Sequence, residues 1–357
     1  MKTNNKIIAL ITLSILVFSV SFGRNEEYSK VYNKEYKVTP GSKLNLENKY
    51  GNIDVMNWDK DMISVKVVLK VNASSKEKAD KLFDQIDIDF SQTGDEISVK
   101  TEFSDDFGKM FRNMDNNLID IHYTVNMPKT IPLDLINKYG NVFINELLST
   151  SVIDIKYGNL KANKILHSEE KPFTEIMLAY SGADIQACTW IKFDVKYSKL
   201  DINDSKALII LSKYSKISVS SGTSIVTESK YDVYRMGKIS NLMATSGYSN
   251  FKADEISNKI LMETRYSDLV VGRVPAGFQS INITSSYGNY KIPIDASASY
   301  KIDGYAKYAK IYIPEDSRVN RFSENNEYKV QGTVGTNKET KSEVTINSHY
   351  GNVKLVD

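Results

Sequence analysis

The side chains that most often bind metals or react with oxidants are scarce in this chain, which has three histidines and one cysteine. His122, His167 and His349 are far apart, and none has a second histidine or a cysteine at the spacing that zinc ligands need. The lone Cys188 excludes a disulfide framework and a cysteine-based metal cluster. We therefore expect no metal site, and we interpret Cys188 as a small buried residue rather than a reactive thiol.

Acidic residues that could work as an acid and a base occur as adjacent pairs, Asp105–Asp106 and Glu169–Glu170. Neighbouring side chains point to opposite sides of a strand, so these pairs suit solvated loops better than a shared catalytic site. The sequence also lacks a nucleophile elbow, a phosphate-binding loop and a dinucleotide fingerprint. These observations predict no enzymatic activity and no cofactor.

A recurring tyrosine, often preceded by a cation, is the more informative pattern. On stacked strands the preceding cations would form a ladder with a spacing of about 4.8 Å. The candidate ligand-facing row comprises Lys196, Lys213, Lys230, Arg265, Tyr197, Tyr214 and Tyr231.

Two interpretations of this row are open. In the first, acidic residues three positions before the tyrosines neutralise the cations and leave a solvated, mixed-charge face. In the second, an exposed aromatic row grips sugar rings, aided by the lysines. Strand parity places Tyr197 on the same side as Val195 and Phe193, so we expect the tyrosines to fill a corner of the core. The acidic residues concerned are Asp154, Asp194, Glu228 and Glu263.

The same tyrosines mark an internal repeat, which decides the architecture. The residue after the tyrosine is small or a turn former in all twelve copies, and Tyr-Gly-Asn occurs five times. Glycine and asparagine accept positive φ at low cost, so the Gly-Asn dipeptide predicts a tight turn. The register tyrosines are Tyr50, Tyr139, Tyr157, Tyr180, Tyr197, Tyr214, Tyr231, Tyr248, Tyr266, Tyr287, Tyr308 and Tyr350.

Apolar residues alternate with polar ones on both sides of each turn, as in strands with one buried face. The repeat therefore predicts an all-β fold, a parallel β-solenoid (β-helix) with rungs of about 17–21 residues. In such a coil Val195 stacks on Leu178 and Ser212, its equivalents one rung away. The alternative is an antiparallel meander of hairpins that turn at Tyr-Gly-Asn.

Residues 1–23 have the pattern of a signal peptide. Lys2 and Lys6 precede an apolar run that ends at Phe18, and Gly23 is the small residue expected before the cleavage site. A membrane anchor is the alternative, but the run falls short of the ~20 residues that span a bilayer. Without the two leader lysines the chain has 44 basic residues against 44 acidic ones. This balance removes the electrostatic case for nucleic acid as a partner.

Residues 24–130 are expected to hold the first repeat copy and an N-terminal cap with a small sheet and one helix. The helix should begin at Ser74 or Ser75 and end near Asp84. Residues 131–357 should hold the solenoid rungs and a C-terminal closing segment, in which the copy at Tyr350 closes the far end. The strands expected in the cap are Met62–Val71, Ile86–Phe90, Glu96–Phe103 and Leu118–Met127.

Three segments carry a resemblance to a known family: Asn48-Lys49-Tyr50-Gly51-Asn52-Ile53, Tyr123-Thr124-Val125-Asn126-Met127-Pro128 before Asn137-Lys138-Tyr139-Gly140-Asn141-Val142, and His349-Tyr350-Gly351-Asn352-Val353. With these, nearly the whole mature chain resembles the bacterial putative-adhesin family of unknown function, common in Bacteroidetes. The resemblance implies a secreted or envelope-associated β-helix without enzymatic activity or catalytic residues. One departure is that serine replaces glycine after the tyrosine in the central copies.

The sequence thus favours a non-enzymatic, exported binding protein of adhesin-like character. We expect it in the periplasm, at the cell surface or outside the cell, with a glycan or a protein of a cell surface as partner. The alternatives are a polysaccharide-active β-helix enzyme, which would rest on fold analogy alone, and a purely structural envelope protein. No later segment is apolar enough to be expected in a membrane.

Overall fold

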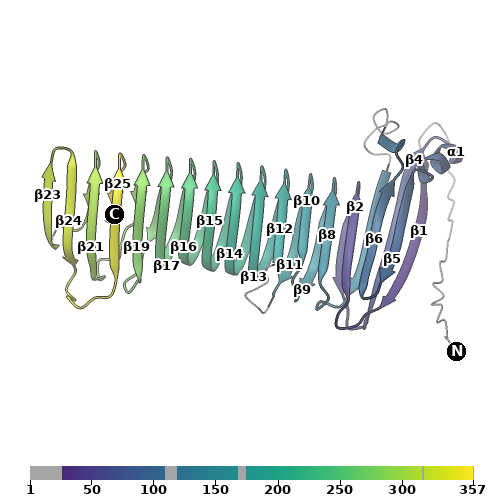
Figure 1. Cartoon of the computed structure of the whole chain (residues 1–357), viewed down its shortest axis with the longest axis horizontal. Helices are drawn as coiled ribbons and strands as arrows, with labels where there is room; N and C mark the ends of the chain where they lie inside the picture. Colours follow the sequence, from purple (N-terminus) through teal and green to yellow (C-terminus); the bar gives the residue numbers. More distant parts are fainter. Residues whose placement is uncertain (1–25, 109–118, 168–173, 316, 357) are drawn as a thin grey trace. The chain divides into compact units, whose positions relative to one another are not determined.

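The computed structural model describes residues 26–108, 119–167, 174–315 and 317–356. The predicted signal peptide lies outside the described residues. The described chain is all-β with one short helix, and it forms two compact units, residues 1–168 and 169–357 (Figure 1). The described ranges contain no helix that is long and apolar enough to cross a membrane.

The described part of the first unit contains the helix and eleven strands. These elements are β1 (Glu26–Lys37), β2 (Lys43–Lys49), β3 (Ile53–Asn57), β4 (Met62–Ala73), α1 (Lys76–Phe83), β5 (Ile86–Thr93), β6 (Glu96–Phe103), β7 (Ile119–Met127), β8 (Leu133–Lys138), β9 (Val142–Leu147), β10 (Val152–Lys156) and β11 (Asn159–Ile165).

The strands of the first unit pair in two runs, β5-β6-β2-β8-β10 and β1-β4-β7-β3-β9-β11. The turn at Tyr50 joins β2 to β3, so the first repeat copy contributes one strand to each run. That copy pairs in parallel with β6 and β7 on one side and with β8 and β9 on the other. The pairs β5–β6, β1–β4 and β4–β7 are antiparallel. The four strands expected between residues 62 and 127 are therefore confirmed over their described residues.

Helix α1 begins where its capping residue predicts. Ser75 has an extended backbone, and its hydroxyl accepts a hydrogen bond from the amide of Lys78 at 3.4 Å. Leu82 and Phe83 are buried at the end of the helix, which lies against β4. The prediction of the helix and of its inward side chains is confirmed.

The second unit is built entirely of strands over its described residues. They are β12 (Thr174–Ala179), β13 (Gly182–Lys196), β14 (Lys199–Lys213), β15 (Lys216–Lys230), β16 (Val233–Gly247), β17 (Asn250–Arg265), β18 (Asp268–Arg273), β19 (Ser280–Ser286), β20 (Tyr290–Lys291), β21 (Tyr300–Lys307), β22 (Ile311–Tyr312), β23 (Arg318–Glu324), β24 (Glu327–Val334), β25 (Glu343–His349) and β26 (Val353–Lys354).

From β12 to β19 successive repeat copies pair in parallel, with one shift of register between β16 and β17 at Ile239/Asn241. From β13 to β17 each strand runs from one tyrosine turn nearly to the next, and it hydrogen-bonds to its equivalents in the neighbouring copies. Val195 pairs with Leu178 on one side and with Ser212 on the other, as the repeat predicts. Apolar side chains alternate inward along both halves of each strand and form the core. The alternative of an antiparallel meander across the turns is wrong for these copies.

The last repeat copy does not close the end of the second unit, and this part of the prediction is wrong. Strand β25 lies between β19 and β21 and pairs in parallel with both. At that end β21 pairs antiparallel with β24, which pairs antiparallel with β23. The chain thus leaves room for one strand between β19 and β21 and forms the β23–β24 hairpin. It then returns, and β25 occupies the position between β19 and β21. The repeat period specifies how a copy folds but does not specify which two copies become its neighbours.

Candidate functional site

The register tyrosines form a ladder of stacked rings in each unit. Adjacent rings in the second unit have centroids 4.8–5.0 Å apart, and their planes diverge by at most 18°. In the first unit Tyr139 stacks on Tyr50 and on Tyr157, at 5.3 and 5.0 Å. In the second unit the spatial order is Tyr180, Tyr197, Tyr214, Tyr231, Tyr248, Tyr266, Tyr287, Tyr350 and Tyr308.

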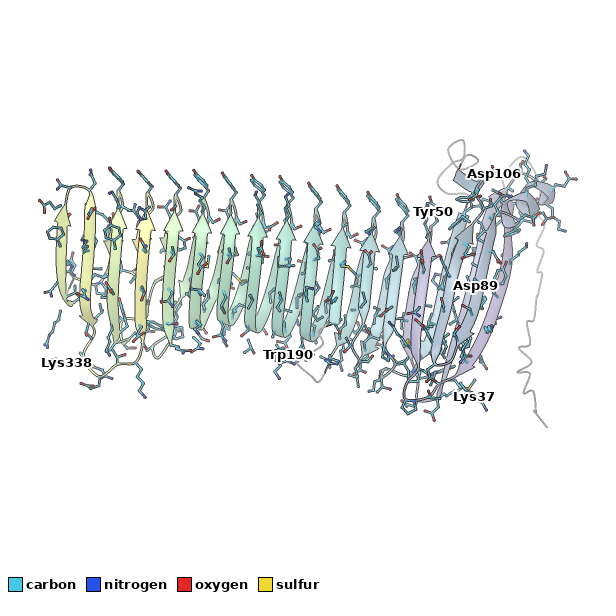
Figure 2. All side chains as sticks on the ribbon, viewed as in Figure 1. Lys37, Tyr50, Asp89, Asp106, Trp190 and Lys338 are labelled. Atoms are coloured by element: carbon cyan, nitrogen blue, oxygen red, sulfur yellow. The ribbon has the colours of Figure 1, made fainter. Side chains whose placement is uncertain are left out.

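The tyrosines point out of the core, which corrects the expectation that they fill its corner. Tyr197, Tyr214 and Tyr231 are 49%, 44% and 40% exposed. In the second unit, side chains at the strand ends stand in a row along one edge, whereas Trp190 lies at the opposite edge (Figure 2). The physical reason is that each register tyrosine has positive φ, between 51° and 61° in this unit. This left-handed conformation interrupts the alternation on which the parity argument depended.

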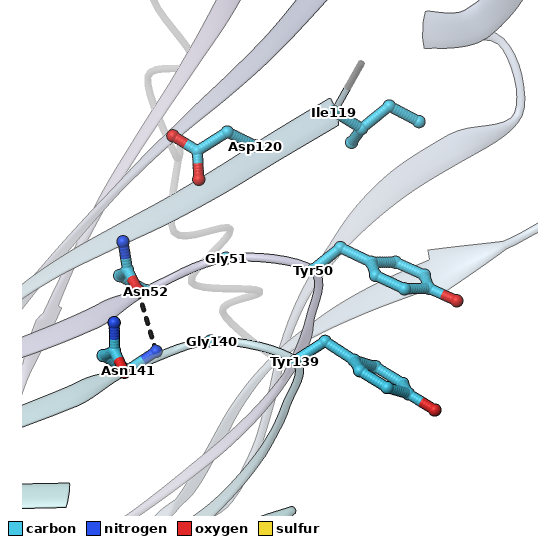
Figure 3. Close-up of a pocket in the computed structure, with 8 residues that line it drawn as sticks. All are labelled: Tyr50, Gly51, Asn52, Ile119, Asp120, Tyr139, Gly140 and Asn141. Atoms are coloured by element: carbon cyan, nitrogen blue, oxygen red, sulfur yellow. Dashed lines mark hydrogen bonds between the residues drawn. The ribbon is translucent and has the colours of Figure 1, made fainter. Parts of the chain in front are cut away.

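Positive φ on the tyrosine also revises the predicted turn chemistry, since the glycine and asparagine that follow have negative φ in these turns. The glycine is needed for a different reason: a Cβ on Gly140 would lie 1.8 Å from the carbonyl oxygen of Gly51. The asparagine side chain connects adjacent turns, because Asn52 Oδ1 accepts a hydrogen bond from the amide of Asn141 at 2.8 Å (Figure 3). These two turns, with Ile119 and Asp120, line a hollow of about 590 Å³ beside Tyr50 and Tyr139.

In the central copies a buried serine or aspartate connects adjacent turns, as the asparagine does in the Tyr-Gly-Asn copies. Ser198, Ser215, Asp232, Ser249 and Ser267 are at most 8% exposed. Each accepts a hydrogen bond from the backbone amide of the equivalent residue in the preceding copy, over distances of 2.7–3.2 Å. The substitution of serine for glycine is therefore a second way of linking the turns. Asp232 also accepts from the hydroxyls of Ser212 and Ser229 and from the amide of Lys230.

Three of the four predicted cations gather in one hollow beside the ladder. Lys196, Lys213 and Lys230 line a depression of about 500 Å³ on the strand segments that precede the tyrosines. The depression extends to Gly247, which takes the place of a cation in the next copy. Arg265 stands one copy further along the row and does not line the hollow. The structure thus brings together the three lysines with Tyr197, Tyr214 and Tyr231 and leaves Arg265 at their margin.

The predicted neutralisation of the cations is confirmed for two acids and not for the others. Asp194 pairs with Lys196 at 2.8 Å, and in the first unit Asp154 pairs with Lys156 at 3.1 Å. Within the described ranges neither Glu228 nor Glu263 forms an ion pair. The ammonium groups of Lys213 and Lys230 instead lie 5.3 and 5.5 Å from the ring centroids of Tyr214 and Tyr231, the tyrosines that follow them.

Two further lysines near the ladder were not predicted from the sequence. Lys199 and Lys216 follow two residues after Tyr197 and Tyr214, at the start of the next strand segments. Lys199 pairs with Asp201 at 2.6 Å, whereas Lys216 has no ion pair in the described part of the chain. A signal was available, because no copy replaces tyrosine by phenylalanine, which suggests that the hydroxyl meets water.

The remaining candidate residues lie apart from the ladder. Burial raises the pKa of the Cys188 thiol to about 12, so the thiol stays protonated, as expected of a small buried residue. His122 lies 3.2 Å from Asp54, and the ring of His349 meets the edge of Tyr305. Among the described residues no group of three histidines, cysteines or acids is placed to hold a metal ion. Asp105 and Asp106 are exposed, and the pair Glu169–Glu170 lies outside the described residues.

Three solved structures align with this chain at very low sequence identity. A putative cell adhesion protein from Clostridium sporogenes aligns with 91% of this chain and 98% of its own, at 11% identity and a TM-score of 0.18. A putative lipid binding protein from Parabacteroides distasonis aligns over 67% and 96%, at 12% identity and a TM-score of 0.33. A putative adhesin from Bacteroides fragilis aligns over 74% and 97%, at 11% identity and a TM-score of 0.30.

No protein-family model and no curated protein matches the chain. TM-scores this far below 0.5 carry no argument about fold or function, so the names of these three proteins describe those proteins alone. What this chain can bind has to be argued from its own surface.

Proposed function

We propose that this chain is an exported, non-enzymatic β-solenoid that binds a glycan of a cell surface along its tyrosine ladder, in an adhesin-like role. The observation that carries the proposal is the ladder itself. Nine tyrosines of the second unit hold their rings 40–54% exposed in one continuous stack. Exposed aromatic groups in a contiguous patch typically mark a binding surface.

The backbone of the ladder supports a role beyond stability. A non-glycine residue in the left-handed region costs of order 1–3 kcal/mol, and here every register tyrosine adopts it. Ring stacking returns roughly 0.5–1.5 kcal/mol per pair. Each added copy brings one strained tyrosine and one new stacked pair, so stacking does not clearly exceed the strain, and contact with a partner explains the outward tyrosine better. Solenoids commonly use such extended surfaces for binding.

The residues before the repeats fit the proposed cap of the solenoid. The block from β4 to β7 covers the first copy with β6 and β7, and the antiparallel pairs β5–β6 and β4–β7 end the parallel pairing there. Exposed strand edges invite aggregation, and covering them is how natural sheets avoid it. The β23–β24 hairpin does the same at one end of the second unit.

A purely structural envelope role is the second candidate, favoured by the stabilisation that stacking supplies. A glycan array distinguishes the two functions when the mature protein is compared with a variant that combines Tyr197→Ala, Tyr214→Ala and Tyr231→Ala. We expect glycan binding to be lost, together with about 1–2 kcal/mol of stability for each tyrosine removed. The control Phe322→Ala removes an aromatic side chain that is 49% exposed on β23, a strand that carries none of the three substituted tyrosines, and should bind normally. If the triple variant bound glycans as well as the wild type does, glycan binding along the ladder would be wrong and the structural role would remain.

Export makes a separate prediction about the mature protein. Cleavage after Gly23 should give a chain that begins at Arg24 or within a few residues of it. N-terminal sequencing of the protein purified from its native cell fractions measures this directly. An intact Met1 on a membrane-bound product would contradict the proposed export and favour an anchor.

A further inference from the structure

The accessible surface of the ladder consists of ring edges and hydroxyl groups rather than ring faces. Each ring from Tyr197 to Tyr287 lies between two nearly parallel neighbours at 4.8–5.0 Å, which cover both of its faces. The edge of an aromatic ring carries the positive part of its quadrupole, and the phenol is a hydrogen-bond donor. The hydroxyls of Tyr197, Tyr214 and Tyr231 make no hydrogen bond within the described chain. A ligand bound to this surface meets hydrogen-bond donors and ring edges, so the surface suits negatively charged oxygens better than the apolar faces of sugar rings.

Three lysines within two residues of these tyrosines have no carboxylate partner in the described part of the chain. Lys213 and Lys230 precede their tyrosines, and Lys216 follows on the other side of the ladder. None of the three forms an ion pair within the described ranges. Glu228, which also lines the hollow, is two residues further along the strand from the tyrosine than Lys230. Along the strand, Lys230 is therefore closer to its tyrosine than Glu228 is.

The donors recur at one spacing along the stack. The successive ring centroids of Tyr197, Tyr214 and Tyr231 are 5.0 and 4.9 Å apart. The lysines that precede them pair in register from one copy to the next, Lys196 with Lys213 and Lys213 with Lys230. A small anion could contact one or two copies, whereas a linear polymer can place successive acid groups along the row. Resting on the proposed function, we infer that the ligand is an acidic linear polysaccharide. Its carboxylate or sulfate groups are bound by the hydroxyls of these tyrosines and by the ammonium groups of the neighbouring lysines.

Two matched pairs of polymers test this ligand class with the mature protein. Polygalacturonate is compared with its fully methyl-esterified form, and dextran sulfate with dextran, so that each pair differs in its acid groups. We expect at least roughly tenfold tighter binding to the acidic member of one pair, weakening as salt rises. The pair that responds distinguishes carboxylate from sulfate.

The outcomes separate this inference from the proposed function. Equal affinity for acidic and neutral members would overturn the acidic ligand while leaving glycan binding intact. No binding to any of these polymers or to the glycan array would contradict both. Tighter binding to single-stranded DNA or to anionic phospholipid vesicles than to either acidic polymer would overturn the assignment to a polysaccharide.

Two sets of substitutions test the site itself. The first set keeps the ring stack and removes the hydroxyls by combining Tyr197→Phe, Tyr214→Phe and Tyr231→Phe. Lys213→Gln with Lys230→Gln removes two charges. Each set should weaken binding of the acidic polymer about tenfold and leave the melting temperature unchanged. The control Lys206→Gln with Lys238→Gln makes the same charge change away from the ladder, where Lys206 lies over Trp190, and should weaken binding less than about twofold. Wild-type affinity in both sets would overturn the site.

Discussion

Replacing Asp232 by leucine should lower the melting temperature of the full chain by roughly 6–12 °C, since a loss of about 3 kcal/mol shifts a unit of this size by 2–4 °C per kcal/mol. Asp232 is 1% exposed and accepts four hydrogen bonds. Leucine would leave the amides of Ser215 and Lys230 without their acceptor, and a buried donor without a partner costs about 1–3 kcal/mol. The hydroxyl of Ser212 could still bond to Tyr234, which limits the loss.

Asp232→Ser is the matched control for this prediction. Serine is the residue at this position of the neighbouring copies, where Ser249 accepts from the amide of Asp232 and Ser215 from the amide of Ser198. The serine variant should therefore keep the link between turns and lose less than half as much stability as the leucine variant. Differential scanning calorimetry of the three proteins gives the comparison. A leucine variant that melts within about 1 °C of wild type would show that the network does not stabilise the unit.

The parts of the fold that follow from local rules could be read from the sequence. Val195 pairs with Leu178 and Ser212 because a 17-residue repeat fixes which residues are equivalent. Ser75 caps α1 because a hydroxyl before a short amphipathic segment satisfies a helix amide. Both depend on residues close together in the chain or on a constant period. The lysine row of the candidate site followed from the same period.

The orientation of the tyrosines could not be read in this way. Parity counting assumes an uninterrupted strand, and Tyr197 interrupts it with a φ of 51°. That conformation is disfavoured for a bulky residue, so propensity argues against it. It is stabilised by contacts that exist once several copies have stacked: the amide of Tyr197 bonds to the carbonyl of Lys213, and its ring packs between Tyr180 and Tyr214. Interactions between copies thus decide a local conformation.

The position of the last copy shows the same limit at a larger scale. Strand β25 could by its sequence have added to the end of the stack, because its Tyr-Gly-Asn turn is like the others. In the structure its turn lies between those of β19 and β21, and Tyr350 stacks on Tyr287 and Tyr308. Which neighbours it has depends on the β23–β24 hairpin occupying the outer edge of β21. That competition for an edge involves residues far apart in the chain.

Gly351→Ala should therefore disturb the inserted copy more than its small change in size suggests. A Cβ at Gly351 would lie 1.9 Å from the carbonyl oxygen of Gly288, a backbone atom of the neighbouring turn that no side-chain rotation can move away. The two turns would have to separate, and we expect a loss of about 3 kcal/mol, the upper end of what overpacking costs. The effect should appear as a lower melting temperature and as faster amide hydrogen exchange in Glu343–His349.

Gly247→Ala provides the comparison for a glycine in a strand that has room beside it. The nearest atom to its added Cβ is the carbonyl oxygen of Arg265 at 3.9 Å, an ordinary contact. Because glycine weakens a strand by roughly 0.5–1 kcal/mol relative to alanine, this variant should be as stable as wild type or more so. If both variants lost the same stability, the close approach of the two turns would not be the cause. If Gly351→Ala left exchange in β25 unchanged, the turn of Gly351 would not be held against that of Gly288, and the place of the last copy between its two neighbours would be wrong.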